Sequence, residues 1–181
     1  IIVIITIIIL SVPFFSNFNS NEINSNEIFL NQINLGKKDF SGLNLSNLDL
    51  HGQNLSNLDF YGTVLQHNDL SFSNLTGSHF SGSNMRWANL TGADLTGSDL
   101  SNTYLYKAIL TDANLEGVNF GKANFCGLEL YNHTFTNSDL SQSDLSFTNL
   151  RFADLTQAKI NGANLRGANL HSADLSGKDL S

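Results

Sequence analysis

The chain has 181 residues, with 16 acidic and 9 basic side chains and a formal net charge of −7, which is the length of one domain. The acidic balance argues against sequence-independent binding of nucleic acid, because that binding requires Lys and Arg to neutralise phosphates. The single cysteine, Cys126, excludes an internal disulfide or a thiolate cluster, and we expect a small surface side chain rather than a reactive thiol.

Residues 1–15 are almost entirely apolar and carry no charged side chain, and the missing initiating Met indicates truncation at the start. The segment is short for a membrane-spanning helix, which needs about 20 residues, but it suits the apolar region of a signal peptide or the tail of a longer membrane segment. We therefore expect export. Membrane anchoring is the alternative, because no good small-residue cleavage site is visible. A third interpretation is a buried strand of the domain, and without a signal the protein would be cytoplasmic.

Residues 16–27 are rich in Asn and Ser, which is the composition of a polar linker. The pattern then changes, and every fifth residue from Leu30 to Leu180 is apolar, without an insertion. A period of five matches neither an amphipathic helix at 3.6 nor a strand at 2, so the chain must change direction once per repeat. The sequence therefore predicts a solenoid over residues 28–181.

Each repeat has a regular order of side chains around its apolar centre. The residue just before the centre is most often Asn or Asp, and the residue two before it is usually small, as at Ala88 and Ala93. Alternate side chains of an extended segment point to the same side, so we expect the centre and the small residue to face inward and Asn or Asp to face outward. Ser or Thr followed by Gly or Asn then supplies a turn, as at Ser81 and Gly82.

The aromatic centres indicate how many repeats close one coil. Phe40, Phe60, Phe80 and Phe120 are separated by multiples of twenty residues, and four repeats per coil would place them in one stacked column. Coils stacked at about 4.8 Å would then form a rod. The final coil of such a rod exposes strand edges, so we expect either further residues after Ser181 or end-to-end pairing with a second copy, a homodimer.

Three segments carry a resemblance to a known family. They read Ala-Asn-Leu-Thr-Gly at 88–92, Ala-Asp-Leu-Thr-Gly at 93–97 and Ala-Asn-Leu-Arg-Gly at 163–167, and with them the chain resembles the pentapeptide-repeat family. The resemblance implies an all-β fold, a right-handed quadrilateral β-helix with four repeats per coil and a narrow, waterless interior. It names no substrate, cofactor or single partner.

Four-sided coils allow the outward residues to be sorted by column. The column of the Phe centres carries aspartates just before the centre, which predict an acidic line and a docking surface for a basic partner. The alternative is that Asp and Asn are interchangeable here for shape and solubility. The aspartates of this line are Asp39, Asp59, Asp99, Asp139 and Asp179.

The adjacent column concentrates aromatic and basic side chains. Trp87 and Tyr106 stand where the pattern prefers Gly and Ser or Thr, on consecutive coils. An exposed aromatic cluster with Arg and Lys nearby has the composition of an interaction hot spot, and the alternative is a set of solitary surface aromatics. The candidate residues are Arg86, Trp87, Tyr104, Tyr106 and Phe147, with Val64, His67 and Lys107 in the same column.

The sequence does not bring together groups for catalysis. The five histidines fall on scattered columns, and neither a paired acid–base motif nor a Gly-rich phosphate loop accompanies them. We therefore predict a noncatalytic scaffold that binds a protein partner through a flat face, without a cofactor, a metal or direct contact with nucleic acid. The alternative, implied by resemblance to the quinolone-resistance proteins of the family, is an acidic DNA mimic that binds DNA gyrase.

Overall fold

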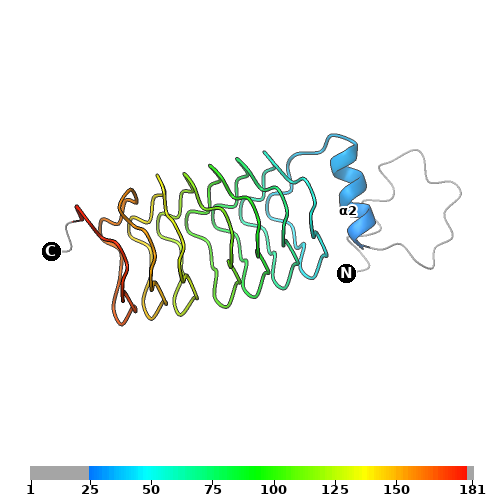
Figure 1. Cartoon of the computed structure of the whole chain (residues 1–181). Coiled ribbons are helices and arrows are strands. Elements are labelled where there is room, and N and C mark those ends of the chain that lie inside the picture. The colour runs from blue at the N-terminus through cyan, green and yellow to red at the C-terminus, as the bar shows by residue number, and fades with distance from the viewer. Residues whose placement is uncertain (1–24, 179–181) are drawn as a thin grey trace, which may run out of the picture.

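The computed structural model describes residues 25–178. These residues form a rod of stacked four-sided coils, with one helix, α2, at the N-terminal end of the rod (Figure 1). Parallel bridges join the residue before nearly every centre to the residue twenty positions later, from Asp39 with Asp59 to Asp154 with Asp174, which confirms four repeats per coil.

Each side of the rod is a parallel sheet made of these isolated bridges rather than of longer strands. We number the four faces by their outward residues. Face 1 contains Asp39, Asp59, His79 and Asp99; face 2 contains Asn44, Val64, Asn84 and Tyr104; face 3 contains Asp49, Asp69, Asn89 and Ile109; face 4 contains Asn54, Asn74, Asp94 and Asn114.

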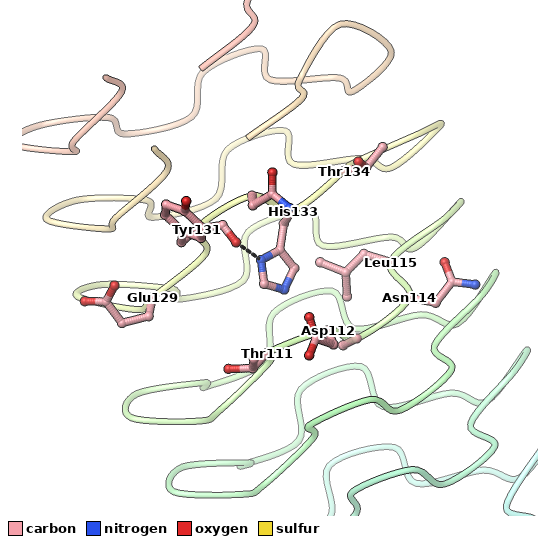
Figure 2. A pocket seen from close by; sticks show the side chains of 10 residues that line it. Thr111, Asp112, Asn114, Leu115, Glu129, Tyr131, His133 and Thr134 are labelled. Carbon is pink, nitrogen blue, oxygen red and sulfur yellow. Dashed lines mark hydrogen bonds between the residues drawn. The ribbon is translucent and has the colours of Figure 1, made fainter. Parts of the chain in front are cut away.

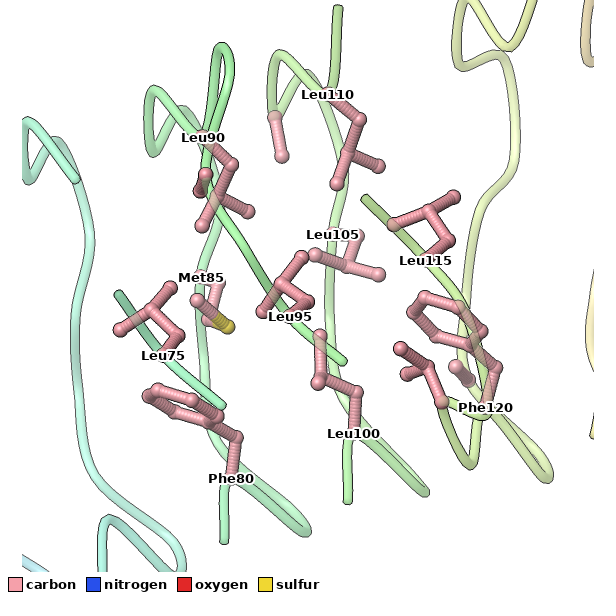
Figure 3. Close-up of a cluster of buried hydrophobic side chains, with 14 of the residues drawn as sticks. Leu75, Phe80, Met85, Leu90, Leu95, Leu100, Leu105, Leu110, Leu115 and Phe120 are labelled. Atoms are coloured by element: carbon pink, nitrogen blue, oxygen red, sulfur yellow. The ribbon is translucent and has the colours of Figure 1, made fainter. Parts of the chain in front are cut away.

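The interior of the rod contains the apolar centres and the small residues two positions before them. Leu90 and Leu95 are fully buried together with Ala88 and Ala93, and Figure 3 shows the centres of consecutive coils packed along one axis. On face 1 the rings of Phe60 and Phe80 are stacked with centroids 4.9 Å apart. The predicted inward pair and the predicted Phe column are therefore both confirmed.

The corners are β-turns with a left-handed residue two positions after the centre. In the corner after Phe80, the amide of Ser83 donates to the carbonyl of Phe80 at 2.9 Å, and Gly82 has φ +69°. Positive φ at the third residue of a four-residue turn is the signature of a type II turn and favours Gly or Asn. Bulkier residues also occupy this position, among them Trp87 with φ +59°.

The outward Asp or Asn closes the corner that follows it. The Oδ1 atom of Asp39 accepts the backbone amide of Ser41 at 2.9 Å and the Ser41 hydroxyl at 2.6 Å. Asn74 accepts the amide and the hydroxyl of Thr76 in the same way, at 3.1 and 2.8 Å. These side chains therefore stabilise the turn in addition to facing solvent.

Helix α2 spans Ser25–Asn34, where we expected linker to residue 27 and repeats from residue 28. Its Phe29 is 4% exposed, and the ring lies 4.8 Å from that of Phe40. Gly36 follows the helix with φ +86°, and its amide donates a hydrogen bond to the carbonyl of Ile33 at 2.8 Å, which is the usual left-handed helix terminus.

The first two predicted centres, Leu30 and Leu35, consequently lie outside the coils, and Leu35 is 72% exposed. The physical reason is that no earlier coil exists among the described residues to pair with this segment. A helix satisfies its own backbone groups, and it packs the apolar side chains of Phe29, Leu30 and Ile33 against the core.

The predicted signal or membrane segment, residues 1–15, lies outside the described residues and stays a prediction, as does most of the predicted linker. Within residues 25–178, no helix combines the length and the apolar character needed to cross a bilayer.

Candidate functional site

The predicted aromatic cluster lies along the corner between face 2 and face 3. The Trp87 ring is stacked on that of His67, with centroids 4.9 Å apart and planes at 5°, and Tyr106 meets Trp87 edge-on at 5.9 Å. Trp87 is 40% exposed and Tyr106 45% exposed. The three rings come from three consecutive coils, so they form a continuous row that is open to solvent.

Two cations lie against this row. The Arg86 guanidinium is 5.4 Å from the centroid of the Tyr104 ring, and the Lys107 ammonium is 5.6 Å from that of Tyr106. Both distances are within the range of a cation–π interaction. The cations therefore flank an aromatic surface instead of interrupting it.

One member of this surface was not predicted from the sequence. Ile109 lies on face 3, one side beyond Tyr106, and both Ile109 and Tyr104 are about half exposed. Each occupies the outward position that most other repeats fill with Asn or Asp, and this departure from the pattern was the signal available in the sequence. We define the aromatic corner as His67, Arg86, Trp87, Tyr104, Tyr106, Lys107 and Ile109.

The structure does not bring Phe147 into the aromatic corner. Phe147 lies on the same corner but three coils beyond Trp87, about 14 Å along the rod at the usual strand spacing. Its ring covers Gly167, since a Cβ on that glycine would lie 2.8 Å from the ring. Phe147 is exposed, but it stands apart from the aromatic cluster around Trp87.

The predicted acidic line is present on face 1, where bridges align Asp39, Asp59, Asp99 and Asp139 in one column. Asp179 lies outside the described residues. His79 stands within the line, with Nδ1 3.2 Å from Asp59 and Nε2 3.7 Å from Asp99.

Hydrogen bonds favour the ionised form of two of these carboxyls. The hydroxyl and the amide of Ser41 lower the pKa of Asp39 below its ordinary value. The pKa of Asp139 is lowered mainly by its bonds from Ser141, with a further contribution from Lys159, whose ammonium is 3.7 Å away. Asp39 and Asp139 are therefore ionised at neutral pH. His79 and Lys159 also lie within the line, and each contacts an aspartate.

A pocket of about 560 Å³ opens between two coils at the corner of face 3 and face 4 (Figure 2). This pocket was not predicted from the sequence. Within residues 25–178, no group of three or more His, Cys, Asp and Glu side chains is placed to hold a metal ion. The pocket is lined by Thr111, Asp112, Ala113, Asn114, Leu115, Glu129, Tyr131, Asn132, His133 and Thr134.

A comparison with models of known protein families identifies the family of this chain. The family described as Pentapeptide repeats matches in 8 copies, over residues 44–82, 83–121, 119–151 and 148–181. The chain belongs to the pentapeptide-repeat family, and its fold is a right-handed quadrilateral β-helix. A comparison with curated protein sequences finds no match.

Solved pentapeptide-repeat structures are similar to this chain at low sequence identity. Rfr23 from the cyanobacterium Cyanothece 51142 is 19% identical, with a TM-score of 0.43, over 81% of this chain and 93% of that one. A trypsin-treated form of QnrB1, a plasmid-mediated fluoroquinolone resistance protein, is 20% identical, with a TM-score of 0.43, over 79% of each chain. HetL from Nostoc sp. strain PCC 7120 is 24% identical, with a TM-score of 0.27, over 86% of this chain and 96% of that one.

Proposed function

We propose that the protein is a noncatalytic scaffold that binds a protein partner through the aromatic corner. The observation that carries this proposal is the row of solvent-open rings from His67 through Trp87 to Tyr106, flanked by two cations. Trp, Tyr and Arg are the residues most enriched among those that dominate protein–protein binding energy.

The shape of the corner favours a protein over a small ligand. Tyr104 lies on face 2 and Ile109 on face 3, so the apolar surface wraps around a convex edge. Small molecules bind in concave sites, whereas a convex edge fits a groove on another macromolecule. Arg86 and Lys107 favour a partner groove with acidic residues at its rim.

The same residues support a noncatalytic role. The aromatic corner contains no carboxylate, and its one histidine, His67, is stacked on an indole rather than paired with an acid. A catalytic site needs converging acid, base or nucleophilic groups, and this surface does not supply them.

The test is a binding comparison of the wild-type protein with a Trp87→Ser, Tyr106→Ser double variant. We expect the double variant to bind an affinity-purified partner at least about tenfold more weakly than the wild-type protein does. Its thermal midpoint of unfolding should change little, because both rings are half exposed. The matched control is Phe72→Ser, an exposed aromatic at the corner of face 3 and face 4. Equal binding by the double variant and the control would contradict the proposal.

A second candidate is the acidic DNA mimic that binds DNA gyrase, and the aspartates aligned on face 1 favour it. Lys159 reduces the net negative charge of that face, and His79 interrupts the line of carboxylates, which is why we place this candidate second. A supercoiling assay tests it, because a mimic would inhibit gyrase and lose inhibition when Asp59 and Asp99 are changed to Asn. Inhibition that survives the change would exclude the acidic line as the cause.

Residues 1–15 support a further proposal of export or membrane attachment, based on their apolar composition alone. Cell fractionation of the chain with and without these residues tests it. An unchanged distribution would contradict the proposal.

A further inference from the structure

One inward position holds a histidine where most other repeats have small or apolar residues. His133 is 7% exposed, and its Nε2 atom lies 2.7 Å from the carbonyl oxygen of Leu110 in the preceding coil. Ser138, the next inward residue, donates to the carbonyl of Leu115 at 2.6 Å in the equivalent bond. The imidazole is longer than the hydroxymethyl group of serine, so the same bond holds the two coils further apart at His133.

The backbone pairing is interrupted at this place. Parallel bridges continue between the same two coils from Tyr104 to Asn124 and from Asn119 to Asp139, but the pairs Ile109–Glu129 and Asn114–Thr134 are not bridged. One coil earlier the amide of Leu90 donates to the carbonyl of Ile109 at 2.7 Å.

The corresponding ladder bonds are absent around His133. Among the described backbone bonds, the amide of Leu110 does not reach Glu129, and the amide of Leu115 does not reach Thr134. The pocket is therefore a slot between coils, and the carbonyls of Glu129 and Thr134 are left without their ladder donors.

The slot is negatively charged. Asp112 is an exposed residue at its edge, and within residues 25–178 its carboxylate makes no hydrogen bond or ion pair. Glu129 stands on the other coil, where one carboxylate oxygen accepts a hydrogen bond from the side-chain Nδ2 of Asn149 at 2.6 Å and the other oxygen is open. The lining contains neither Lys nor Arg. Figure 2 shows His133 between the coils, with Asp112 on one coil and Glu129 and Tyr131 on the other.

We propose that this slot binds an organic cation, a guanidinium or ammonium group on an alkyl stem. The carboxylates of Asp112 and Glu129 and the released carbonyls accept hydrogen bonds from such a group, and the half-exposed ring of Tyr131 offers a cation–π contact. An anion is repelled by the two carboxylates. A metal ion lacks three suitable side chains among the described residues.

This site is independent of the proposed scaffold function. The aromatic corner lies between face 2 and face 3, whereas the slot opens between face 3 and face 4. Either proposal can fail without the other, because a Trp87 variant leaves the slot intact and an Asp112 variant leaves the aromatic corner intact.

The experiment is a titration of the whole protein with arginine amide and, separately, with spermidine, followed by calorimetry and by the backbone amide resonances of Leu110 and Leu115. We expect saturable binding with shifts at both amides, and a loss of about tenfold or more in affinity in the Asp112→Asn variant. The matched control is Asp144→Asn on face 2, which removes one carboxylate elsewhere and should leave the affinity unchanged.

A second variant distinguishes binding in the slot from attraction of the probes by charge alone. His133→Ser should let the coils close and abolish binding while the fold is retained. Stronger binding of arginine amide than of spermidine would indicate an arginine side chain as the natural occupant, and the reverse order would indicate a free polyamine. Failure of both probes to bind, or equal losses in the Asp112 and Asp144 variants, would overturn the proposal.

Discussion

The exchange of His133 for Ser should stabilise the rod. A serine at this position can make the short bond to Leu110 that Ser138 makes to Leu115, so the coils can close to their ordinary spacing. Closure restores the ladder bonds of the Leu110, Leu115 and Thr134 amides, each worth about 0.5–1.5 kcal/mol. Loss of the buried imidazole, whose ring lies 6.3 Å from that of Phe135, removes about 1 kcal/mol of packing. We therefore expect a net gain of about 2 kcal/mol.

Hydrogen exchange measures this gain where it arises. The amides of Leu110 and Leu115 should exchange at least about tenfold more slowly in the His133→Ser variant, and the urea midpoint should rise. The reverse change, Ser138→His, is the matched control and should open a gap at the next repeat and lower stability. Unchanged exchange at both leucines, together with a lower urea midpoint, would show that the histidine supports the coils instead of separating them.

Other substitutions test the core, the corners and the outward aspartates. Phe80→Ala should lower the free energy of unfolding by about 3–5 kcal/mol in urea titrations, because it removes a fully buried stacked ring. Gly82→Ala should cost about 1–2 kcal/mol through its positive φ alone. Gly92→Ala should cost more, because its Cβ would lie 2.6 Å from the Phe72 ring, and the excess should disappear in a Phe72→Ala background. The pKa of Asp69 is lowered by bonds from its own corner, so the ionised form stabilises the fold above the ordinary pKa of 3.8 and this contribution is lost as the pH falls through the lower folded value. Asp69→Asn keeps the acceptor and should show a smaller loss of stability on acidification, measured by thermal midpoints.

The rod could be predicted from the sequence because its period is expressed in every repeat. The spacing of Phe40, Phe60 and Phe80 gave four repeats per coil, and the stacked rings confirm it. The inward and outward positions followed from alternation along an extended side, which depends on local geometry alone. The start of the rod could not be predicted in this way. Leu30 and Leu35 fit the period, but an edge repeat also needs a neighbouring coil with which to pair.

The slot was missed for a related reason. The sequence shows His133 at an inward position, but the effect of a large inward side chain depends on which atom of the preceding coil it contacts. The bond from Nε2 to the carbonyl of Leu110 decides that the coils separate, and it joins residues 23 positions apart. The replacement of a small inward residue by His133 was visible in the sequence. Its effect on the coils could be predicted only with knowledge of which residues face each other in neighbouring coils.

The positions within a repeat are not equally free to carry function. The centre and the residue two before it fill the interior, and the residue just before the centre closes the following corner when it is Asn or Asp. A binding residue at these positions displaces a structural contact. At the two corner residues it displaces at most the Ser or Thr hydroxyl bond to that acceptor, while the backbone amide bond remains. Trp87, Tyr106 and Asp112 are all corner residues. Tyr104 and Ile109 are the informative exceptions, because each gives up the corner-closing acceptor and each lies beside a corner already occupied by aromatic side chains. An exposed apolar residue in place of the outward Asn or Asp removes the hydrogen bonds that close one corner. It adds no contact inside the coil, so any compensating contact lies outside it. This is the strongest reason to expect a partner at this surface.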